Sequence, residues 1–373
     1  MKIMVTGGLG FIGQALGRRL RDLGHGVVLI DSLTPQIHGT LPAVTAPEGV
    51  EVVRLDVRDL AQRAELVDGC DAVYHLAAET GTAQSMYRVQ EYVGVNEMGT
   101  AALIEAIAAA DRRPTKVILA SSRSVYGEGA YIDPARPGTI IQPAPRTPEQ
   151  LAANAWEPTH ADGTPLVAIP TPESLPFYPG SIYAATKASQ ELLLSAAGPA
   201  LGFKPVIFRF QNVYGEGQSL QNPYTGILSI FFNRARQGKA IPIYEDGLES
   251  RDFIHIQDIV DGLIAALNAD LPSGAIMNLG AGVPTTVNEL VAQLLASGGF
   301  DVPVHVTGQY RVGDIRHCFA DLTRAKSLLG FAPKVSLADG ISRFCAWAGS
   351  QPEHEDKLEQ AAAELRARNL MGD

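Results

Sequence analysis

The stretch KIMVTGGLGFIG (residues 2–13) places an apolar run directly before a glycine-rich turn and the start of a predicted helix. Such a turn needs one glycine to change direction, a second where a phosphate approaches the backbone, and a third where the helix packs on the strand. Free N–H groups at the start of the helix bind an anion. The residues predicted to form this dinucleotide-binding turn are Gly7, Gly10, Phe11, Ile12 and Gly13.

Acidic residues follow the second and third predicted strands, at residues 27–30 and 52–55. Asp31 lies about 20 residues after the glycine turn, where a carboxylate accepts from both ribose hydroxyls and repels a 2′-phosphate. NAD is therefore favoured over NADP. Asp56 and Val57 are predicted to contact the adenine, and Asp56 could instead, or in addition, cap a helix.

The first part of the chain alternates short apolar runs with helical patterns. Further strands are expected at residues 2–5, 72–76 and 116–120, and helices at 61–67 and 98–110. Apolar strands that alternate with helices indicate an α/β fold with a doubly wound parallel sheet. Three residues at the end of the fourth strand are expected where backbone passes close to the cofactor: Leu76, Ala77 and Ala78.

A proline-rich stretch interrupts this pattern. Eleven of the 24 prolines lie between residues 134 and 179, so we expect an irregular insertion or lid at about 129–179. Smaller, mixed elements follow: helices at 183–197 and 226–236, a strand at 205–210, further segments at 241–244, 258–267 and 287–296, and a final helical part.

The domain organisation predicted from these patterns has three parts. Residues 1–180 form a nucleotide-binding domain that includes the insertion. Residues 181–350 complete that fold and form a smaller mixed α/β substrate domain. Residues 351–373 form a helical or mobile tail.

A tyrosine and a lysine four residues apart fall on one face of a predicted helix: Tyr183 and Lys187. Removing a hydride from an alcohol requires a base for the hydroxyl proton, and a nearby ammonium favours the phenolate form of a tyrosine. Ser122, at the end of the strand at 116–120, could relay that proton. Taken alone, each of these is more often an ordinary helix or loop residue, and their value lies in the combination.

Composition limits the remaining possibilities. The net charge is −10, from 40 acidic and 30 basic residues, which disfavours nucleic acid and anionic membranes as partners. The three separated cysteines form no metal-ligand spacing and are expected to be reduced thiols, and the histidines give no metal motif. The N-terminal residues do not resemble a signal peptide and no apolar run is long enough for a membrane span, so a cytoplasmic protein is expected.

The combined motifs resemble the extended short-chain dehydrogenase/reductase superfamily, whose nucleotide domain has the Rossmann fold. The chain looks most like its NAD-dependent nucleotide-sugar 4-epimerases, over residues 1 to about 347. The resemblance implies a homodimer formed through helices 98–110 and 183–197, and places Asn96 and Ser121 beside the cofactor. It assigns the substrate site to Ser122, Asn212, Arg251, Arg311 and Asp314.

Several positions depart from the relatives. The 4,6-dehydratases of this superfamily carry an Asp-Glu pair after the active-site hydroxyl residue, where this chain has Arg123 and Ser124. Neither can protonate a leaving hydroxyl or remove a carbon-bound proton, so dehydration is disfavoured. Galactose epimerases carry a lysine near the position of Thr80. The insertion, with residues 218–226 and 313–318, resembles the dTDP-L-rhamnose 4-epimerase branch.

The predicted reaction is 4-epimerisation of a nucleotide-diphosphate sugar through a 4-keto intermediate, with dTDP-L-rhamnose as the expected substrate. Three alternatives stay open: a UDP- or CDP-hexose 4-epimerase, a 4-keto sugar reductase or dehydrogenase of the same fold, and a non-catalytic NAD sensor. The intact Ser122, Tyr183 and Lys187 set argues against the sensor.

Overall fold

The computed structural model describes residues 1–39, 47–160, 162–222, 224 and 226–372. Its main feature is a seven-stranded, fully parallel sheet in the order β13-β9-β5-β4-β1-β2-β3. The strands are β1 (Lys2–Thr6), β2 (Gly26–Asp31), β3 (Glu51–Arg54), β4 (Ala72–His75), β5 (Lys116–Ser122), β9 (Lys204–Phe210) and β13 (Ala275–Leu279). All six strands expected from sequence are confirmed, and the fold class with them.

Helices cover both faces of this sheet because successive strand residues point to opposite sides. Ile3 and Val5 pack on one face, and Met4 between them packs on the other. The first face is covered by α1 (Phe11–Asp22), α9 (Ile256–Asn268) and α11 (Thr323–Leu329). The second is covered by the 3₁₀ helix η1 (Val57–Leu66), α5 (Gly99–Ala109) and α7 (Ile182–Leu201).

Two helix predictions are corrected. The helix expected at 61–67 is a 3₁₀ helix that begins earlier, because the Asp56 carboxylate accepts from the Arg58 N–H at 2.9 Å and caps it. Its conformation breaks at Arg63, which has non-helical backbone angles. The helix expected at 98–110 starts as α5 at Gly99, after a π-helical turn η2 (Val93–Met98). Short helices surround them: α2 (Pro35–His38), α3 (Thr82–Ser85), α4 (Val89–Tyr92) and η3 (Arg123–Tyr126).

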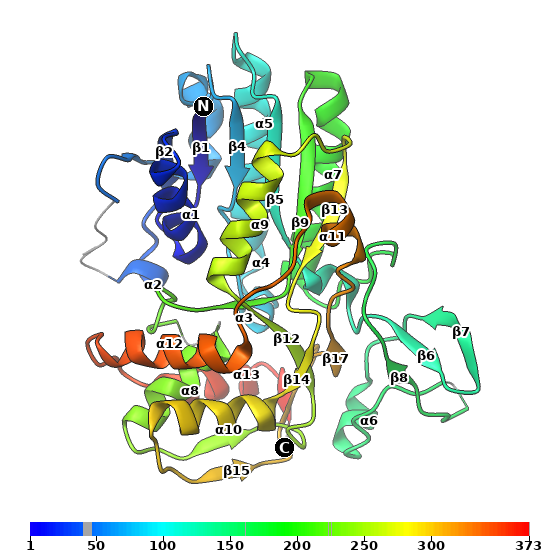
Figure 1. Cartoon of the computed structure of the whole chain (residues 1–373). Coiled ribbons are helices and arrows are strands. Elements are labelled where there is room, and N and C mark those ends of the chain that lie inside the picture. The colour runs from blue at the N-terminus through cyan, green and yellow to red at the C-terminus, as the bar shows by residue number, and fades with distance from the viewer. Residues whose placement is uncertain (40–46, 161, 223, 225, 373) are drawn as a thin grey trace.

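A second, smaller layer lies below the carboxyl edge of the large sheet (Figure 1). It has its own hydrophobic core, in which aromatic residues such as Phe232 and Phe344 are fully buried. Its helices are α8 (Ile227–Arg236), α10 (Val287–Gly298) and α12 (Leu337–Gly349). Its strands are β10 (Asn212–Tyr214), β11 (Ile241–Ile243), β12 (Ser250–His255), β14 (Pro284–Thr286), β15 (Val304–Val306) and β17 (His317–Cys318).

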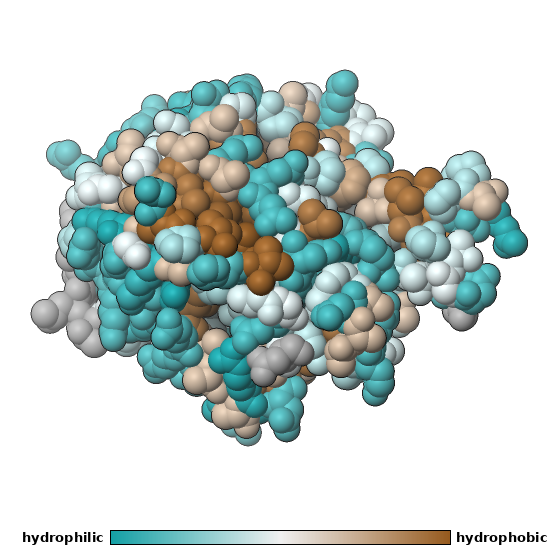
Figure 2. Space-filling view, turned by 90° about the horizontal axis from the view of Figure 1, so that it is seen from below, coloured by the Kyte–Doolittle hydropathy of each residue, from teal (hydrophilic) through white to brown (hydrophobic). Residues whose placement is uncertain are grey.

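The proline-rich insertion folds as a small three-stranded sheet rather than a structureless loop. Its elements are β6 (Tyr131–Asp133), β7 (Arg136–Ile141), α6 (Pro148–Ala152) and β8 (Val167–Ala168). In Figure 1 it stands to one side of the body beside β17. Seen from below, it projects from a body whose surface mixes hydrophilic side chains with hydrophobic patches (Figure 2).

The C-terminal tail, predicted to be helical or mobile, contains a helix and a short strand. It forms α13 (Leu358–Arg366) and β18 (Met371–Gly372), and β18 pairs with β16 (Tyr310–Arg311). Leu365 and Met371 pack against Tyr87 of the part built on the large sheet and Tyr244 of the smaller layer. The tail therefore connects both parts of the molecule.

No helix in the described part of the chain is long and apolar enough to cross a membrane.

Candidate functional site

The glycine turn between β1 and α1 has the geometry expected from the sequence. Gly7 has a φ of 66°, and a Cβ there would lie 2.8 Å from the Ala77 backbone nitrogen. A Cβ on Gly13 would collide with the Gly7 carbonyl oxygen. Gly10 precedes α1 and offers no side chain to cap it, so the first-turn N–H groups have no side-chain cap acceptor. The turn is therefore an open cradle for an anion.

Asp31 ends β2 and is held in a fixed orientation. Its two carboxylate oxygens accept from the Leu9 N–H at 3.0 Å and the Leu33 N–H at 2.8 Å. The His38 Nε2 lies 3.5 Å from the same carboxylate. Burial alone would raise the pKa of Asp31, but these donors outweigh it and lower the pKa below its usual value. The carboxylate stays charged at neutral pH, as the ribose-binding role requires.

Asp56 confirms the capping alternative and also faces the cavity. Besides the Arg58 N–H, its carboxylate accepts from the Arg58 guanidinium at 2.9 and 2.6 Å. Asp56 and Val57 both line the cavity that contains the glycine turn. Capping and ligand contact are therefore compatible here.

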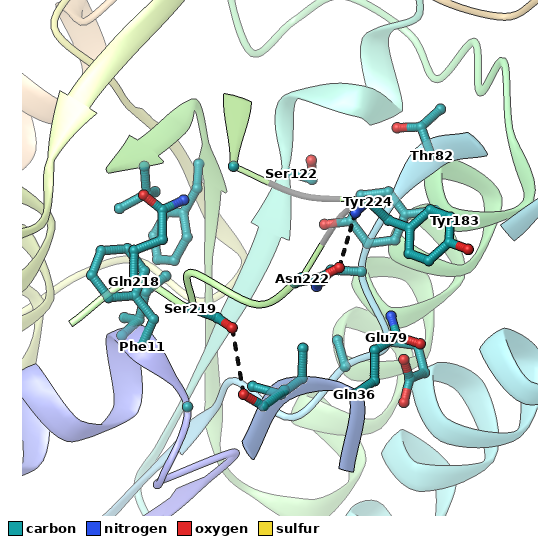
Figure 3. A pocket seen from close by; sticks show the side chains of 18 of the residues that line it. Phe11, Gln36, Glu79, Thr82, Ser122, Tyr183, Gln218, Ser219, Asn222 and Tyr224 are labelled. Atoms are coloured by element: carbon teal, nitrogen blue, oxygen red, sulfur yellow. Dashed lines mark hydrogen bonds between the residues drawn. The ribbon is translucent and has the colours of Figure 1, made fainter. Parts of the chain in front are cut away.

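Ser122 ends β5 and Tyr183 begins α7, so two different elements bring the two hydroxyls to one side of the cavity (Figure 3). The Tyr183 backbone N–H donates to Ser85 Oγ at 3.0 Å, which fixes the first turn of α7. Burial raises the pKa of the Tyr183 phenol, while the Ser122 hydroxyl and the Arg123 charge lower it. The pKa of the phenol is raised overall, and Ser122 and Arg123 offset part of the effect of burial.

Lys187 lies one turn further along α7 and is buried. Its Nζ donates to the Ala120 carbonyl at 2.9 Å and lies 6.0 Å from the centre of the Tyr183 ring. Burial lowers the pKa of Lys187 to about 7, against the opposing effect of Glu191. The ammonium is thus tied to the end of β5.

Ser121 points away from the reacting side of β5. Its hydroxyl donates to the Glu191 carboxylate, which forms a buried ion pair with Arg209 at 2.8 Å. Ser121 nevertheless lines the cavity. Any contact of Ser121 with a cofactor would therefore be short-range packing or backbone contact rather than a bond from this hydroxyl.

The two arginines that the resemblance assigned to the substrate site share one supporting segment. Arg251 donates to the Ile315 carbonyl at 2.7 Å and to the Arg316 carbonyl at 3.0 Å. Arg311 forms an ion pair with Asp314 at 2.6 Å. Burial would raise the pKa of Asp314, but Arg311 and Arg251 lower it overall. Residues 311–316 therefore fix both guanidinium groups.

A single cavity of about 1190 Å³ unites these residues. It lies at the carboxyl edge of the parallel sheet, where ligands of such sheets bind. Of the predicted site residues, the following line it: Gly7, Gly10, Phe11, Ile12, Gly13, Asp31, Asp56, Val57, Leu76, Ala77, Ala78, Ser121, Ser122, Tyr183, Lys187, Asn212, Arg251, Arg311 and Asp314.

Asn96 is the predicted site residue that does not line this cavity. It is fully buried, and its amide accepts from the Glu79 N–H at 2.8 Å and donates to the Glu79 carbonyl at 3.1 Å. It also donates to Thr186 Oγ1 at 2.9 Å. Asn96 thus holds the wall segment at Glu79 against α7, which is a positioning contact.

Several cavity residues were not assigned a role from sequence. Figure 3 shows Gln218, Ser219, Asn222 and Tyr224 on the loop that crosses the cavity opposite Gln36. The Ser219 hydroxyl donates to the Ile37 carbonyl at 3.4 Å, which joins this loop to α2. No motif marks these residues individually, although the stretch 218–226 was singled out as a whole.

Among the described residues, no group of three or more His, Cys, Asp or Glu side chains could hold a metal ion.

Comparison with known proteins places the chain in a family. The pattern of the NAD dependent epimerase/dehydratase family matches residues 3–149 and 159–280, and the chain belongs to this family. It is 38% identical to the dTDP-L-rhamnose 4-epimerase of Burkholderia thailandensis, over 95% of this chain and 97% of that protein. It is 31% identical to the UDP-glucose 4-epimerase of Mycolicibacterium smegmatis, over 92% of this chain and 97% of that one.

A solved structure agrees with these relatives. The UDP-glucuronic acid 4-epimerase from Bacillus cereus, in complex with UDP-glucuronic acid and NAD, superposes with a TM-score of 0.75 at 26% identity. The match covers 94% of this chain and 99% of that chain. The cofactor of this family is NAD. The cradle at Gly7 and Gly13 and the charged Asp31 fit it.

Proposed function

We propose that the protein is an NAD-dependent nucleotide-sugar 4-epimerase whose substrate is dTDP-L-rhamnose. The observation that carries the reaction class is the placement of Ser122, Tyr183 and Lys187 in one cavity with the glycine turn. The same cavity contains Arg251 and Arg311. Proton-transfer groups in one part of the cavity and arginines suited to a diphosphate in another are what a sugar nucleotide requires.

The glycine turn and Asp31 would hold NAD by its pyrophosphate and its adenosine ribose, and Lys187 would hold the nicotinamide ribose. NAD supplies a reversible hydride acceptor for the sugar C4. The cavity wall at Leu76, Ala77 and Ala78 offers small or apolar side chains along this path.

The proton chemistry belongs to this chain. Tyr183 accepts the C4 hydroxyl proton, and Ser122 bonds the same oxygen and relays the proton. The positive charge of Arg123 favours the phenolate. In the return step Tyr183 gives the proton back to the same oxygen, so the side chains of the protein end a turnover in the protonation states in which they began it.

The substrate must turn over between the two hydride transfers without leaving. Arg251 and Arg311 present rigid guanidinium forks, which suit bidentate contact with phosphate oxygens. With the diphosphate fixed, the 4-keto sugar ring can rotate about the bonds that join it to the phosphate. This division between a fixed and a mobile part is what an epimerase requires.

Dehydration is disfavoured by the residues at 123 and 124. Arg123 donates from Nε to Asn212 Oδ1 at 3.0 Å, and Ser124 donates to Ser122 Oγ at 3.0 Å. Neither side chain is a carboxylic acid that could protonate a leaving hydroxyl. A 4-keto reductase or dehydrogenase of the same fold is separated from an epimerase by net consumption of nicotinamide cofactor.

The choice of dTDP-L-rhamnose rests on the relative from Burkholderia thailandensis and on the resemblance of the insertion and residues 218–226 and 313–318. UDP- and CDP-hexoses are the alternatives. The test is incubation of the purified protein with dTDP-L-rhamnose, UDP-glucose, UDP-glucuronic acid and a CDP-hexose, without added cofactor. NMR should show the C4 epimer of dTDP-L-rhamnose forming fastest, and turnover of another sugar nucleotide alone would overturn the substrate assignment.

We also propose a homodimer. α7 packs beside α4, η2 and α5, and these neighbouring elements leave apolar side chains exposed: Met98 by 60%, Leu192 by 59% and Val89 by 40%. Exposed apolar groups on adjacent helices suit a self-complementary interface. Leu192→Glu should convert a dimer to a monomer in light-scattering measurements, and a wild-type monomer would refute the proposal.

A further inference from the structure

Arg146 connects the proline-rich insertion to the substrate end of the cavity. It lies between β7 and α6, and its side chain is 1% exposed. The two terminal nitrogens donate to both carboxylate oxygens of Glu245, at 2.8 and 2.9 Å. One of them also donates to the backbone carbonyl of Asp314 at 2.9 Å. The two terminal nitrogens of this buried guanidinium are thus held by groups from two distant segments, while its Nε makes no hydrogen bond to the described residues and lies 3.5 Å from the Glu128 carboxylate.

Both of these segments belong to the cavity wall. Glu245 and Asp314 line the cavity, and the Asp314 carboxylate holds Arg311. The next two carbonyls along the chain, at Ile315 and Arg316, hold Arg251. A displacement of residues 314–316 would therefore move the guanidinium groups of Arg251 and Arg311.

Four more contacts join this segment and its neighbours to the insertion and the residue just before it. The Arg316 backbone N–H donates to Glu128 at 2.6 Å, just before the insertion. Glu157, within the insertion, pairs with Arg316 at 2.6 Å and with His317 at 3.1 Å. Trp156 packs its ring 6.3 Å from that of Tyr310. The family pattern stops at residue 149 and resumes at 159, so Trp156 and Glu157 lie outside the shared pattern.

The backbone conformation of Glu245 is one that contacts with neighbouring residues must stabilise. Its φ is 48°, in the left-handed region that a residue with a Cβ adopts at a cost. Such conformations persist where neighbouring contacts over-determine them, and they gather at binding sites. Here the carboxylate is held by Arg146 and, at 3.1 Å, by Arg316.

We propose that the insertion is a rigid bracket for the diphosphate pocket, in which Arg146 is the positioning residue for Arg251 and Arg311. The inference rests on the proposed function, because it assigns those arginines to the diphosphate of a sugar nucleotide. It gives the insertion a role other than that of a moving lid. Arg146 itself does not touch the substrate.

The test compares Arg146→Met with Arg146→Lys and with Arg136→Met, an arginine in the same insertion whose side chain is 85% exposed. Binding of dTDP and of UDP to the NAD-loaded protein is measured by calorimetry, together with kcat, KM and bound NAD. Arg146→Met should weaken nucleotide binding and raise KM by about tenfold or more, the scale of coupling within one network. Its kcat should change by less than about threefold and its NAD content should be unchanged.

The controls separate positioning from general support of the fold. Arg146→Lys should recover part of the nucleotide affinity, and Arg136→Met should behave like wild type. If Arg146→Met lowers kcat and NAD content along with nucleotide affinity, the residue supports the fold as a whole and the proposal fails. If that variant does not fold, Glu157→Gln is used, since its carboxylate is 47% exposed and its removal spares the core. Unchanged nucleotide binding in Glu157→Gln would then overturn the proposal.

Failure of the two proposals gives different results. Wild-type protein that binds dTDP but epimerises no sugar nucleotide refutes the reaction, while weaker dTDP binding by Arg146→Met still supports the bracket. Wild-type protein that epimerises its substrate, with unchanged dTDP binding in Arg146→Met, refutes the bracket alone.

Discussion

Arg123 donates a hydrogen bond from Nε to Asn212 Oδ1 over 3.0 Å, and this contact holds a guanidinium in the wall of the cavity next to Ser122. Burial and the nearby Arg251 lower the pKa of Arg123, and the charge of Arg123 in turn lowers the pKa of Tyr183. The sequence suggested Lys187 as the activating cation; in the structure its ammonium donates to the Ala120 carbonyl and lies 6.0 Å from the centre of the Tyr183 ring. Arg123 is a further cation whose charge acts on the phenol.

Arg123→Met should shift the pH dependence of catalysis. Removing the positive charge raises the pKa of Tyr183, so the phenolate forms only at higher pH. The acidic limb of the kcat profile should move to higher pH. Arg123→Lys retains the charge and should leave the limb closer to its wild-type position. An unmoved limb in Arg123→Met would show that another cation sets the ionisation of Tyr183.

Tyr183→Phe keeps the ring and its edge-to-face contact with Tyr92, 6.5 Å away, and removes the proposed proton acceptor. We expect kcat to fall by about 10²–10⁴-fold, the usual contribution of a positioned acid–base group. NAD content should persist, because the glycine turn, Asp31 and Lys187 are untouched. Ser122→Ala should cost less, since water or the substrate hydroxyl can partly replace a relay. Saturating substrate and thermal melting provide the controls, and wild-type turnover by Tyr183→Phe would rule out this mechanism.

Asp31 should determine the identity of the bound cofactor. The purified protein should carry NAD, and acid extraction followed by chromatography identifies it. Asp31→Asn keeps the size of the side chain but removes its charge, so NAD affinity should fall by about tenfold or more, the scale of one charge-assisted hydrogen bond. Recovery of mainly NADP from wild type would contradict the role of this carboxylate.

The sequence predicted the sheet and most of the cavity because those features depend on local pattern. A strand, a glycine turn and a helix follow each other within residues 2–22, and the carboxyl ends of parallel strands meet at one edge. Once that topology is known, Asp31 and Ser122 must lie near Gly7. The lysine four residues after Tyr183 follows from helical spacing alone.

Other features depend on contacts between residues far apart in the sequence. The amide of Asn96 is consumed by the Glu79 backbone, which no local motif reveals. The same holds for Arg146 and Glu245, which are 99 residues apart. The sequence of the 3₁₀ helix at Val57–Leu66 has an ordinary amphipathic pattern. That pattern indicates neither the 3₁₀ type of the helix nor the irregular backbone at Arg63.

The contacts of the C-terminal tail lead to a prediction that the sequence did not suggest. The Glu364 carboxylate accepts hydrogen bonds from the Tyr87 hydroxyl at 3.1 Å and from the Tyr224 hydroxyl at 2.7 Å. These two tyrosines come from segments far apart in the sequence. β18 pairs Met371 with Arg311, and the Val312 N–H donates to the Leu370 carbonyl at 3.0 Å. The tail therefore supports the strand that carries Arg311 as well as joining the two parts.

Deletion of residues 358–373 should raise KM for the sugar nucleotide while leaving bound NAD unchanged, because the groups that hold Asp31, at Leu9, Leu33 and His38, lie outside the tail. It should also lower the melting temperature, since burial of Leu365 and Met371 contributes about 1.5–3 kcal/mol each. Glu364→Ala tests the link between the two parts without deleting the strand, and should raise KM by less. Glu359→Ala is the matched control, since its side chain is 84% exposed and its pair with Arg234 contributes little. An unchanged KM in the deletion variant would show that Arg311 is held by Asp314 and the rest of its segment without help from the tail.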